Sequence, residues 1–157
     1  MKIVSDLNRF IDAQRNSYET ALEEIKSGKK RSHWMWYIFP QLKGLGFSNI
    51  SKQYAIKDQY EAEQYLSHPV LGSRLINICY ALLKLKTRNI RSVFGTPDDL
   101  KLKSSMTLFA SLRNSDPIFQ QILDEFFQMQ PDQQSLEILN KEKAQSSDFY
   151  LKHYHWR

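Results

Sequence analysis

Apolar side chains recur every three or four residues in two long stretches of the chain, which is the spacing of one face of a helix. The first stretch covers residues 6–27, and a break near Asn16 would divide it into two helices. The second stretch covers residues 68–86, where Pro69 suits the first position of a helix. Its apolar face consists of Leu71, Leu75, Ile78, Leu82 and Leu85.

Start and stop signals predict further, shorter helices. Asp58 and Asp116 each stand where an N-cap belongs, and Pro40 ends a short helix over about residues 33–38. Residues 132–139 predict a last helix. We therefore expect an all-α protein, a single compact multi-helix domain of about seven or eight helices over residues 1–145. We expect residues 146–157 to be an irregular, aromatic C-terminal tail.

Composition agrees with a globular protein in a reducing compartment. The 157 residues are 41% hydrophobic and 25% charged, which suits one domain with one core. The one cysteine, Cys79, lies in an apolar run and reads as a core residue. No signal peptide and no apolar run long enough for a membrane span is seen, so we expect a cytoplasmic protein without membrane contact.

The formal net charge is +5, and lysines and arginines cluster in three places. Such clusters attract phosphorylated small molecules or nucleic acid. Helix ends that are rich in lysine explain them equally well. The favoured partner is a phosphorylated small molecule, nucleic acid is the less favoured one, and the sequence leaves the oligomeric state open.

The segment His33–Gly46, HWMWYIFPQLKGLG, combines aromatic, polar and glycine residues. Burial of the whole segment is one interpretation, because a helix that is apolar on all sides belongs in a core. The other is that part of it walls a pocket for a planar ligand. We expect Trp34, Met35 and Phe39 in the core, and His33, Trp36, Gln41 and Lys43 in a cleft.

A second unusual segment, residues 101–109, reads KLKSSMTLF. Ser104 and Thr107 lie three residues apart on one helix face, and Lys101 precedes Ser104 by three. This polar stripe suits a phosphate or ribose, and it equally suits close contact between helices. The candidate ligand-binding residues are His33, Trp36, Gln41, Lys43, Ser48, Tyr54, Lys101, Ser104 and Thr107. No catalytic residue, metal ligand or cofactor is predicted, because no known catalytic or metal-binding motif occurs.

Several long motifs resemble one bacterial family of unknown function, called domain of unknown function eighteen-ten or Rv-eighteen-seventy-three-like. They are KKRSHWMWYIFPQLKGLG, HPVLGSRL and FGTPDDLKLKSSMTLF, in this order. The resemblance covers about residues 6–140 and implies one mainly helical domain without an established activity.

A fainter resemblance, carried by YAI, EAEQYL and SSMTLFASLRNSDPIFQQILDEF, is to the helical part of the NADAR superfamily. That likeness implies an ADP-ribose-like or nucleotide ligand and N-glycosidic hydrolysis. The family's glutamate–histidine pair is missing here, so no catalytic glutamate is carried over. The best-supported function is small-molecule binding, and the alternative is a protein-interaction or nucleic-acid-binding module without catalysis.

Overall fold

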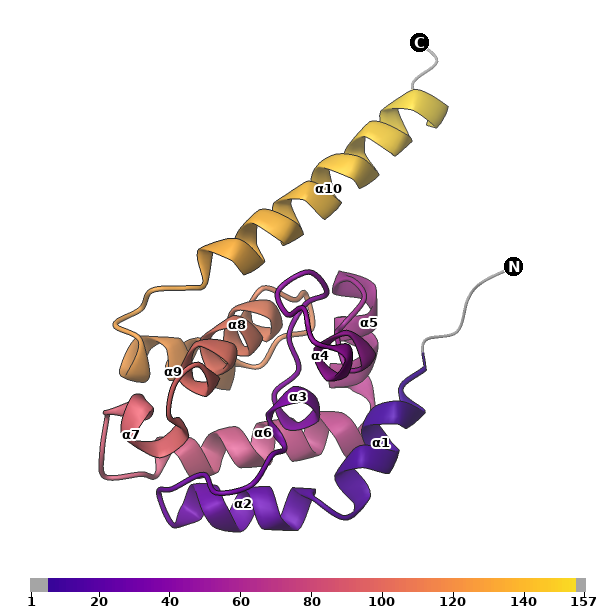
Figure 1. The fold of residues 1–157 in the computed structure, drawn as a ribbon. Coiled ribbons are helices and arrows are strands. Elements are labelled where there is room, and N and C mark those ends of the chain that lie inside the picture. The colour runs from indigo at the N-terminus through magenta and orange to yellow at the C-terminus, as the bar shows by residue number, and fades with distance from the viewer. Residues whose placement is uncertain (1–5, 155–157) are drawn as a thin grey trace.

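The structure is a computed structural model that describes the backbone of residues 6–154 and the side chains of residues 6–147. Over this part the chain forms ten helices and no strand, arranged as one domain (Figure 1). The predicted all-helical class is confirmed, but the number of helices exceeds the seven or eight expected. They are α1 (Asn8–Arg15), α2 (Tyr18–Lys26), α3 (Met35–Ile38), α4 (Asn49–Gln53), α5 (Gln59–Ser67), α6 (Pro69–Leu83), α7 (Ile90–Phe94), α8 (Asp98–Ala110), α9 (Pro117–Phe126) and α10 (Gln133–Tyr154).

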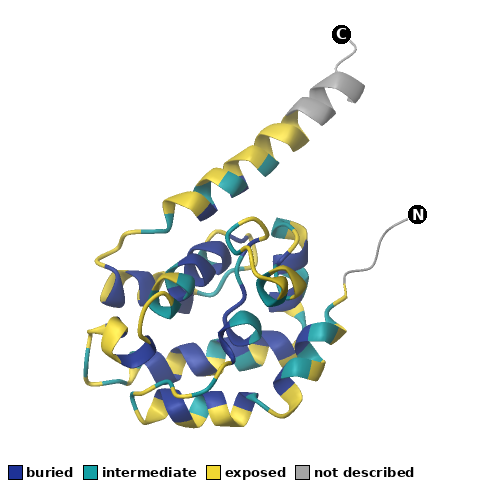
Figure 2. Ribbon diagram, in the orientation of Figure 1, coloured by how far each residue is buried: buried dark blue, intermediate teal, exposed yellow. Residues whose placement is uncertain are grey.

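Helix α6 is the centre of the domain and packs against α2, α5 and α9. Its core face is dark blue in Figure 2, and Leu71, Leu75 and Ile78 are at most 1% exposed. The ring nitrogen Nδ1 of His68 accepts hydrogen bonds from the first backbone N–H groups of α6. Pro69 occupies the first turn, as predicted. The apolar spacing and the cap together explain why this helix forms here.

Helices α5 and α6 meet at a very short distance, and a glycine makes this contact feasible. A Cβ atom at Gly72 would lie 2.0 Å from the carbonyl oxygen of Leu66. Real Cβ atoms do not approach an oxygen so closely, so only glycine fits. Glycine is unfavourable inside a helix, so its presence at this position is a packing requirement.

Helix α8 forms the opposite side of the core, between α9, α5, α7 and α10. Six consecutive residues of α8, from Ser104 to Phe109, are buried. The Phe109 ring packs against Tyr65 and Phe119, with centroid distances of 5.5 and 5.6 Å. Helix α8 is thus enclosed on nearly all sides over these six residues, and its first turns reach the surface.

Helix α10 begins on α8 and then runs away from the domain (Figure 1). Its first turns bury Ser135 and Leu139, whereas residues 143–147 are all exposed (Figure 2). The Gln59 N–H donates to the Glu142 carboxylate at 3.2 Å, which ties α10 to the start of α5. The expected irregular conformation of residues 146–157 is wrong as far as Tyr154, where the helix ends. Residues 155–157 lie outside the described residues.

Among the described residues, none of the helices combines the length and the apolar character that crossing a bilayer requires.

Candidate functional site

One buried carboxylate on α2 fixes the segment that leads into α3. Glu24 is 8% exposed and accepts hydrogen bonds from the N–H groups of Arg31 and Ser32 at 2.8 and 2.9 Å. The Ser32 hydroxyl and the Trp34 indole N–H donate to the same carboxylate at 2.5 and 2.9 Å. Burial alone would raise the pKa of Glu24, but these hydrogen bonds outweigh it and lower the pKa to about 2. Residues 31–34 are therefore held by a permanent negative charge.

Helix α3 is one turn long and divides buried from partly exposed aromatic side chains. Trp34, Met35 and Phe39 are each 1% exposed, so the predicted core positions are confirmed. The Phe94 ring of α7 packs edge-on against Trp34 and Phe39, with centroid distances of 6.2 and 5.9 Å. Because these neighbours are anchored in the core, Trp36 is left on the partly exposed face of the turn.

Backbone pairing closes the loop that follows α3. The Lys43 N–H donates to the Ile56 carbonyl at 2.8 Å, and the Ile56 N–H donates to the Gln41 carbonyl at 2.9 Å. A Cβ atom at Gly46 would lie 2.6 Å from the Cβ of Ser51. The glycine therefore lets the loop press against α4, and the pairing places Gln41 beside the residues that follow that helix.

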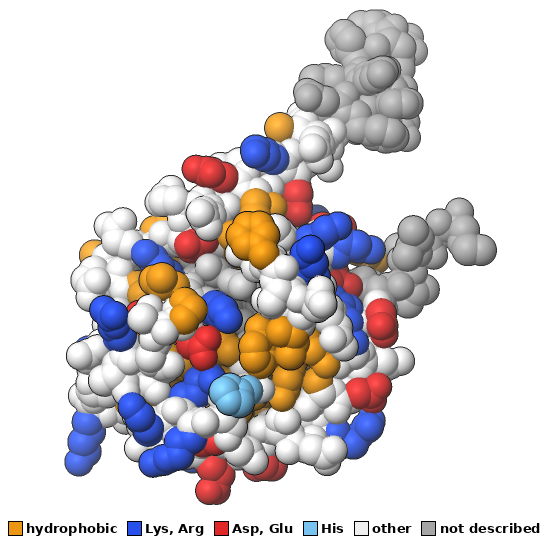
Figure 3. All heavy atoms as spheres, viewed as in Figure 1, with side chains coloured by type: hydrophobic (Ala, Val, Ile, Leu, Met, Phe, Trp, Pro, Cys, Tyr) orange, Lys and Arg blue, Asp and Glu red, His pale blue; other side chains and the backbone are white. Residues whose placement is uncertain are grey.

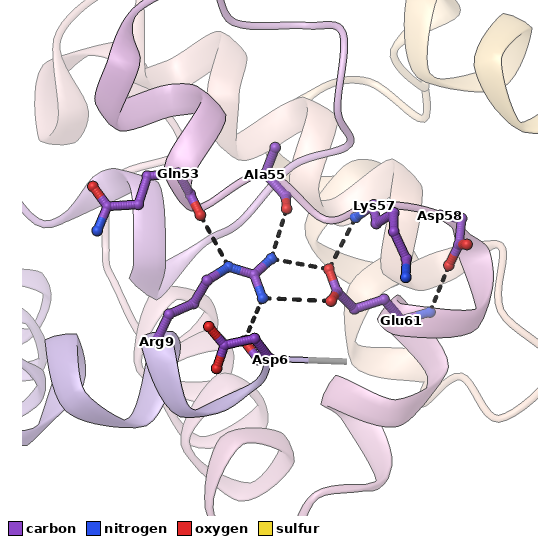
Figure 4. Close-up of polar contacts among 7 residues, drawn as sticks. All are labelled: Asp6, Arg9, Gln53, Ala55, Lys57, Asp58 and Glu61. Atoms are coloured by element: carbon purple, nitrogen blue, oxygen red, sulfur yellow. Dashed lines mark hydrogen bonds and ion pairs between the residues drawn. The ribbon is translucent and has the colours of Figure 1, made fainter. Parts of the chain in front are cut away.

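A partly buried ion pair positions the end of α4, as Figure 4 shows. The Arg9 guanidinium donates to the carbonyl oxygens of Gln53 at 2.9 Å and of Ala55 at 2.8 Å, on either side of Tyr54. It also pairs with the Glu61 carboxylate at 3.0 Å. Burial raises the pKa of Glu61, but the hydrogen bonds from Arg9 and a backbone N–H outweigh it, so the pKa is lowered. The backbone on both sides of Tyr54 is thereby held by Arg9 of α1, which in turn is held by Glu61 of α5.

Helix α8 brings a lysine to the exposed side of Trp36. The Lys101 ammonium lies 5.4 Å from the centre of the Trp36 ring, within the range of a cation–π contact. It lies 3.6 Å from Asp98, one turn earlier on α8. Asp98 also pairs with Lys30 at 3.0 Å. Two lysines from distant segments thus share one carboxylate beside the aromatic side chains.

Trp36, Gln41, Tyr54 and Lys101 meet at one small hollow. Its lining is completed by Met35, Phe39, Ser51 and Ala55. The hollow contains about 240 Å³ of atom-free space, of which the centre of a water molecule can reach about 10 Å³. That is room for about one water. On the face shown in Figure 3, hydrophobic side chains gather over α3 and α4, with lysine or arginine side chains nearby.

A larger depression lies between α5 and α10, but its chemistry is different. Water centres can occupy about 820 Å³ of it, and it is open to solvent. Some of its charged groups are already paired: Arg113 with Glu63 at 3.1 Å, and Glu142 with the Gln59 N–H. Ligand sites combine apolar walls with a few converging polar groups. Among the described depressions, the hollow beside Trp36 meets that description better.

The structure separates three predicted site residues from this hollow. His33 is exposed and lines a different depression. Lys43 is exposed in the loop and does not line the hollow. Ser48 caps α4 by accepting the Ser51 N–H at 3.1 Å.

The hydroxyl stripe of α8 is buried and bonded to its own helix. The Ser104 hydroxyl donates to the Leu100 carbonyl at 3.1 Å, and the Thr107 hydroxyl donates to the Lys103 carbonyl at 2.8 Å. The Thr107 oxygen also accepts the Asp132 N–H at 2.8 Å, which joins α8 to the start of α10. These two hydroxyls serve packing, so we leave Ser104 and Thr107 out of the site.

Sequence reasoning missed the residues that support the hollow. Arg9, Glu24, Lys30 and Asp98 lie outside the two conspicuous segments, His33–Gly46 and residues 101–109. One signal was present, because Glu24 is an acidic residue just before the cluster KKRSHW. The ion pair of Arg9 with Glu61 joins residues 52 positions apart, which no local pattern reveals.

The fold and the hollow define a small all-helical, single-domain protein without a recognisable catalytic constellation among its described residues. The chain belongs to the family described as Protein of unknown function (DUF1810), whose model matches residues 4–139. It is also similar to the crystal structure of the conserved hypothetical protein Rv1873 from Mycobacterium tuberculosis, with 41% identity and a TM-score of 0.84. That match covers 86% of this chain and 96% of the other. No curated protein matches the chain.

These matches establish the predicted family, whereas they lend no support to the NADAR resemblance. The family match ends at Leu139, so the exposed part of α10 lies beyond it.

Proposed function

We propose that this protein binds a planar small molecule at the hollow formed by Trp36, Gln41, Tyr54 and Lys101. The observation that carries the proposal is convergence: α3, the loop after it, the end of α4 and α8 each bring one of these side chains to the same place. Separate contacts hold each contributing segment, so the arrangement is rigid enough to recognise a shape.

The chemistry of the four side chains suits a ring with polar edges. Trp36 and Tyr54 offer aromatic surface for stacking. The Gln41 side-chain amide makes no hydrogen bond to any described residue, so it can donate and accept with a ligand. The hollow has room for about one water, so it admits one substituent of a ligand, while the ligand's ring lies across the exposed surface of Trp36 and Tyr54. Lys101 stands at the rim.

The same lining argues against N-glycosidic hydrolysis as part of the proposal. Cleavage of such a bond needs a carboxylate or another acid–base group near the reacting atom. Among the described residues that line the hollow, none carries a carboxylate or an imidazole. We therefore propose binding and assign no reaction.

The alternative of an interaction or nucleic-acid-binding module has weaker support. Lys30 and Lys101 are paired with Asp98, and Arg88 is paired with Glu125 at 3.0 Å, so part of the basic clusters is neutralised within the chain. The aromatic side chains of residues 149–157 lie outside the described residues.

A thermal-shift screen tests the proposal directly. The purified protein is heated with nucleotides, ADP-ribose, NAD, phosphosugars and small heteroaromatic compounds. A ligand at about 100 times its dissociation constant stabilises the folded state by about 2.7 kcal/mol, which gives a clear rise in melting temperature. We expect a hit that Trp36→Leu removes and Phe47→Leu retains, because Phe47 lies in the neighbouring loop and is 83% exposed.

Circular dichroism checks that both variants are folded. No shift with any compound, or a hit that persists in folded Trp36→Leu, contradicts the proposal.

A further inference from the structure

We infer that the ligand of this hollow carries an anionic group, which Lys101 receives while Lys30 keeps Asp98 neutralised. The inference rests on the proposed function and deepens it by naming the class of ligand. Lys30 and Lys101 share the Asp98 carboxylate, but Lys30 lies closer to it than Lys101 does.

Lys30 is the fixed partner of Asp98. Its side chain is 8% exposed, and its ammonium lies 3.0 Å from Asp98 Oδ2. The same ammonium donates to the Ser32 carbonyl at 2.5 Å and lies 4.8 Å from the centre of the Trp34 ring. Separating a buried charge from three partners has a high free-energy cost. Lys30 therefore balances Asp98 whether or not a ligand is present.

Lys101 is the loose partner. Its side chain is 25% exposed, and its ammonium lies 3.6 Å from Asp98 Oδ1, longer than a normal hydrogen bond. Its other close contact is the Trp36 ring, at 5.4 Å. Contacts of this kind are weak and partly screened by water. Lys101 can therefore turn to a ligand without leaving Asp98 unpaired.

The net charge of Lys30, Lys101 and Asp98 indicates which class of ligand suits the hollow. Two lysines and one aspartate leave one net positive charge, and it lies on the side chain that lines the hollow. A neutral planar ligand would leave this charge unused. An anionic substituent on the ring, either a phosphate or a carboxylate, would meet it at the rim and form a charge-assisted hydrogen bond.

Two matched pairs of probes test the inference by isothermal titration calorimetry. Adenosine is compared with adenosine 5′-monophosphate, and nicotinamide with nicotinate. We expect the anionic member of at least one pair to bind about three- to tenfold tighter, the range of a partly exposed charged contact. The preference should vanish in Lys101→Met and persist in Lys101→Arg. It should also persist in Lys103→Met, a lysine of the same helix that does not line the hollow.

The outcomes separate the two proposals. A preference only in the adenosine pair identifies phosphate, and one only in the nicotinamide pair identifies carboxylate. Equal binding of neutral and anionic probes, lost in Trp36→Leu, overturns the inference and leaves the proposed function standing. A preference that survives in Lys101→Met overturns it as well. If no probe binds even with millimolar affinity, the inference fails, because Lys101 beside the Trp36 ring must hold an aromatic anion at least that well. The thermal-shift screen decides the proposed function separately.

Discussion

Replacing Glu24 by glutamine tests the support of the α3 segment without changing its shape. The amide keeps one acceptor oxygen in place, but the negative charge that receives four hydrogen bonds is lost. The pKa of Glu24 falls from its ordinary value of 4.5 to about 2 in the folded protein. A difference of this size corresponds to about 3 kcal/mol of folding free energy. Since Glu24 also borders an open surface depression, water screens part of this, and we expect about 2 kcal/mol.

The sign of the pH dependence follows from the lowered pKa. The contribution of Glu24 to stability is fully present above its unfolded pKa near 4.5 and is lost as the pH falls toward 2. Urea denaturation of wild type and Glu24→Gln, followed by far-ultraviolet circular dichroism, measures both free energies of unfolding. The gap between them should be about 2 kcal/mol near neutral pH and should shrink as the pH falls from 4.5 toward 2.

The exposed neighbour supplies the control, since Glu23→Gln should change stability by less than about 0.5 kcal/mol. A Glu24→Gln variant as stable as wild type near neutral pH would show that the Glu24 charge does not stabilise the fold. A gap that does not change with pH would lead to the same conclusion.

Three further predictions concern the framework around the site. Arg9→Met removes the ion-pair partner of the Glu61 carboxylate, which is 3% exposed, and should lower the free energy of unfolding by about 3 kcal/mol in urea denaturation. The control Arg15→Met, at an exposed ion pair, should lower it by less than about 0.5 kcal/mol, and equal losses would contradict the prediction. Gly72→Ala places a methyl group 2.0 Å from the Leu66 carbonyl oxygen of α5 and should lower the free energy of unfolding by more than about 3 kcal/mol or prevent folding. A urea midpoint equal to that of wild type would contradict the close approach of α5 and α6. Burial raises the pKa of the Cys79 thiol well above its ordinary value, so a thiol reagent at mildly alkaline pH should label it only after denaturation. Rapid labelling of the native protein would contradict the burial of Cys79.

Periodicity and caps predicted most helices because these features act locally. Asp58 and Asp116 each accept the backbone N–H that an N-cap should receive. The last helix was predicted too short for a physical reason. Residues 140–147, NKEKAQSS, have no apolar face, so periodicity ends at Leu139. Several of them are good helix formers, and backbone propensity continues α10 where packing no longer contributes.

The site could be predicted only in part, because sequence patterns do not show what a polar side chain already binds. Trp36 and Lys101 were singled out as unusual residues, and the structure places them 5.4 Å apart, ammonium to ring centre. Ser104 was singled out for the same reason, yet its hydroxyl bonds to the preceding turn. Lys30 and Asp98 come from segments far apart in the chain, and their pairing depends on how α8 packs beside residues 30–34.

A two-dimensional NMR titration of isotopically labelled protein tests whether the ligand binds at the hollow, because it shows which residues a ligand contacts. The protein is titrated with the strongest hit of the thermal-shift screen. We expect the largest shifts on the Trp36 indole N–H, the Gln41 side-chain amide and the backbone around Tyr54, with small shifts at His33. Shifts centred on the depression between α5 and α10, or spread evenly over the surface, would contradict it.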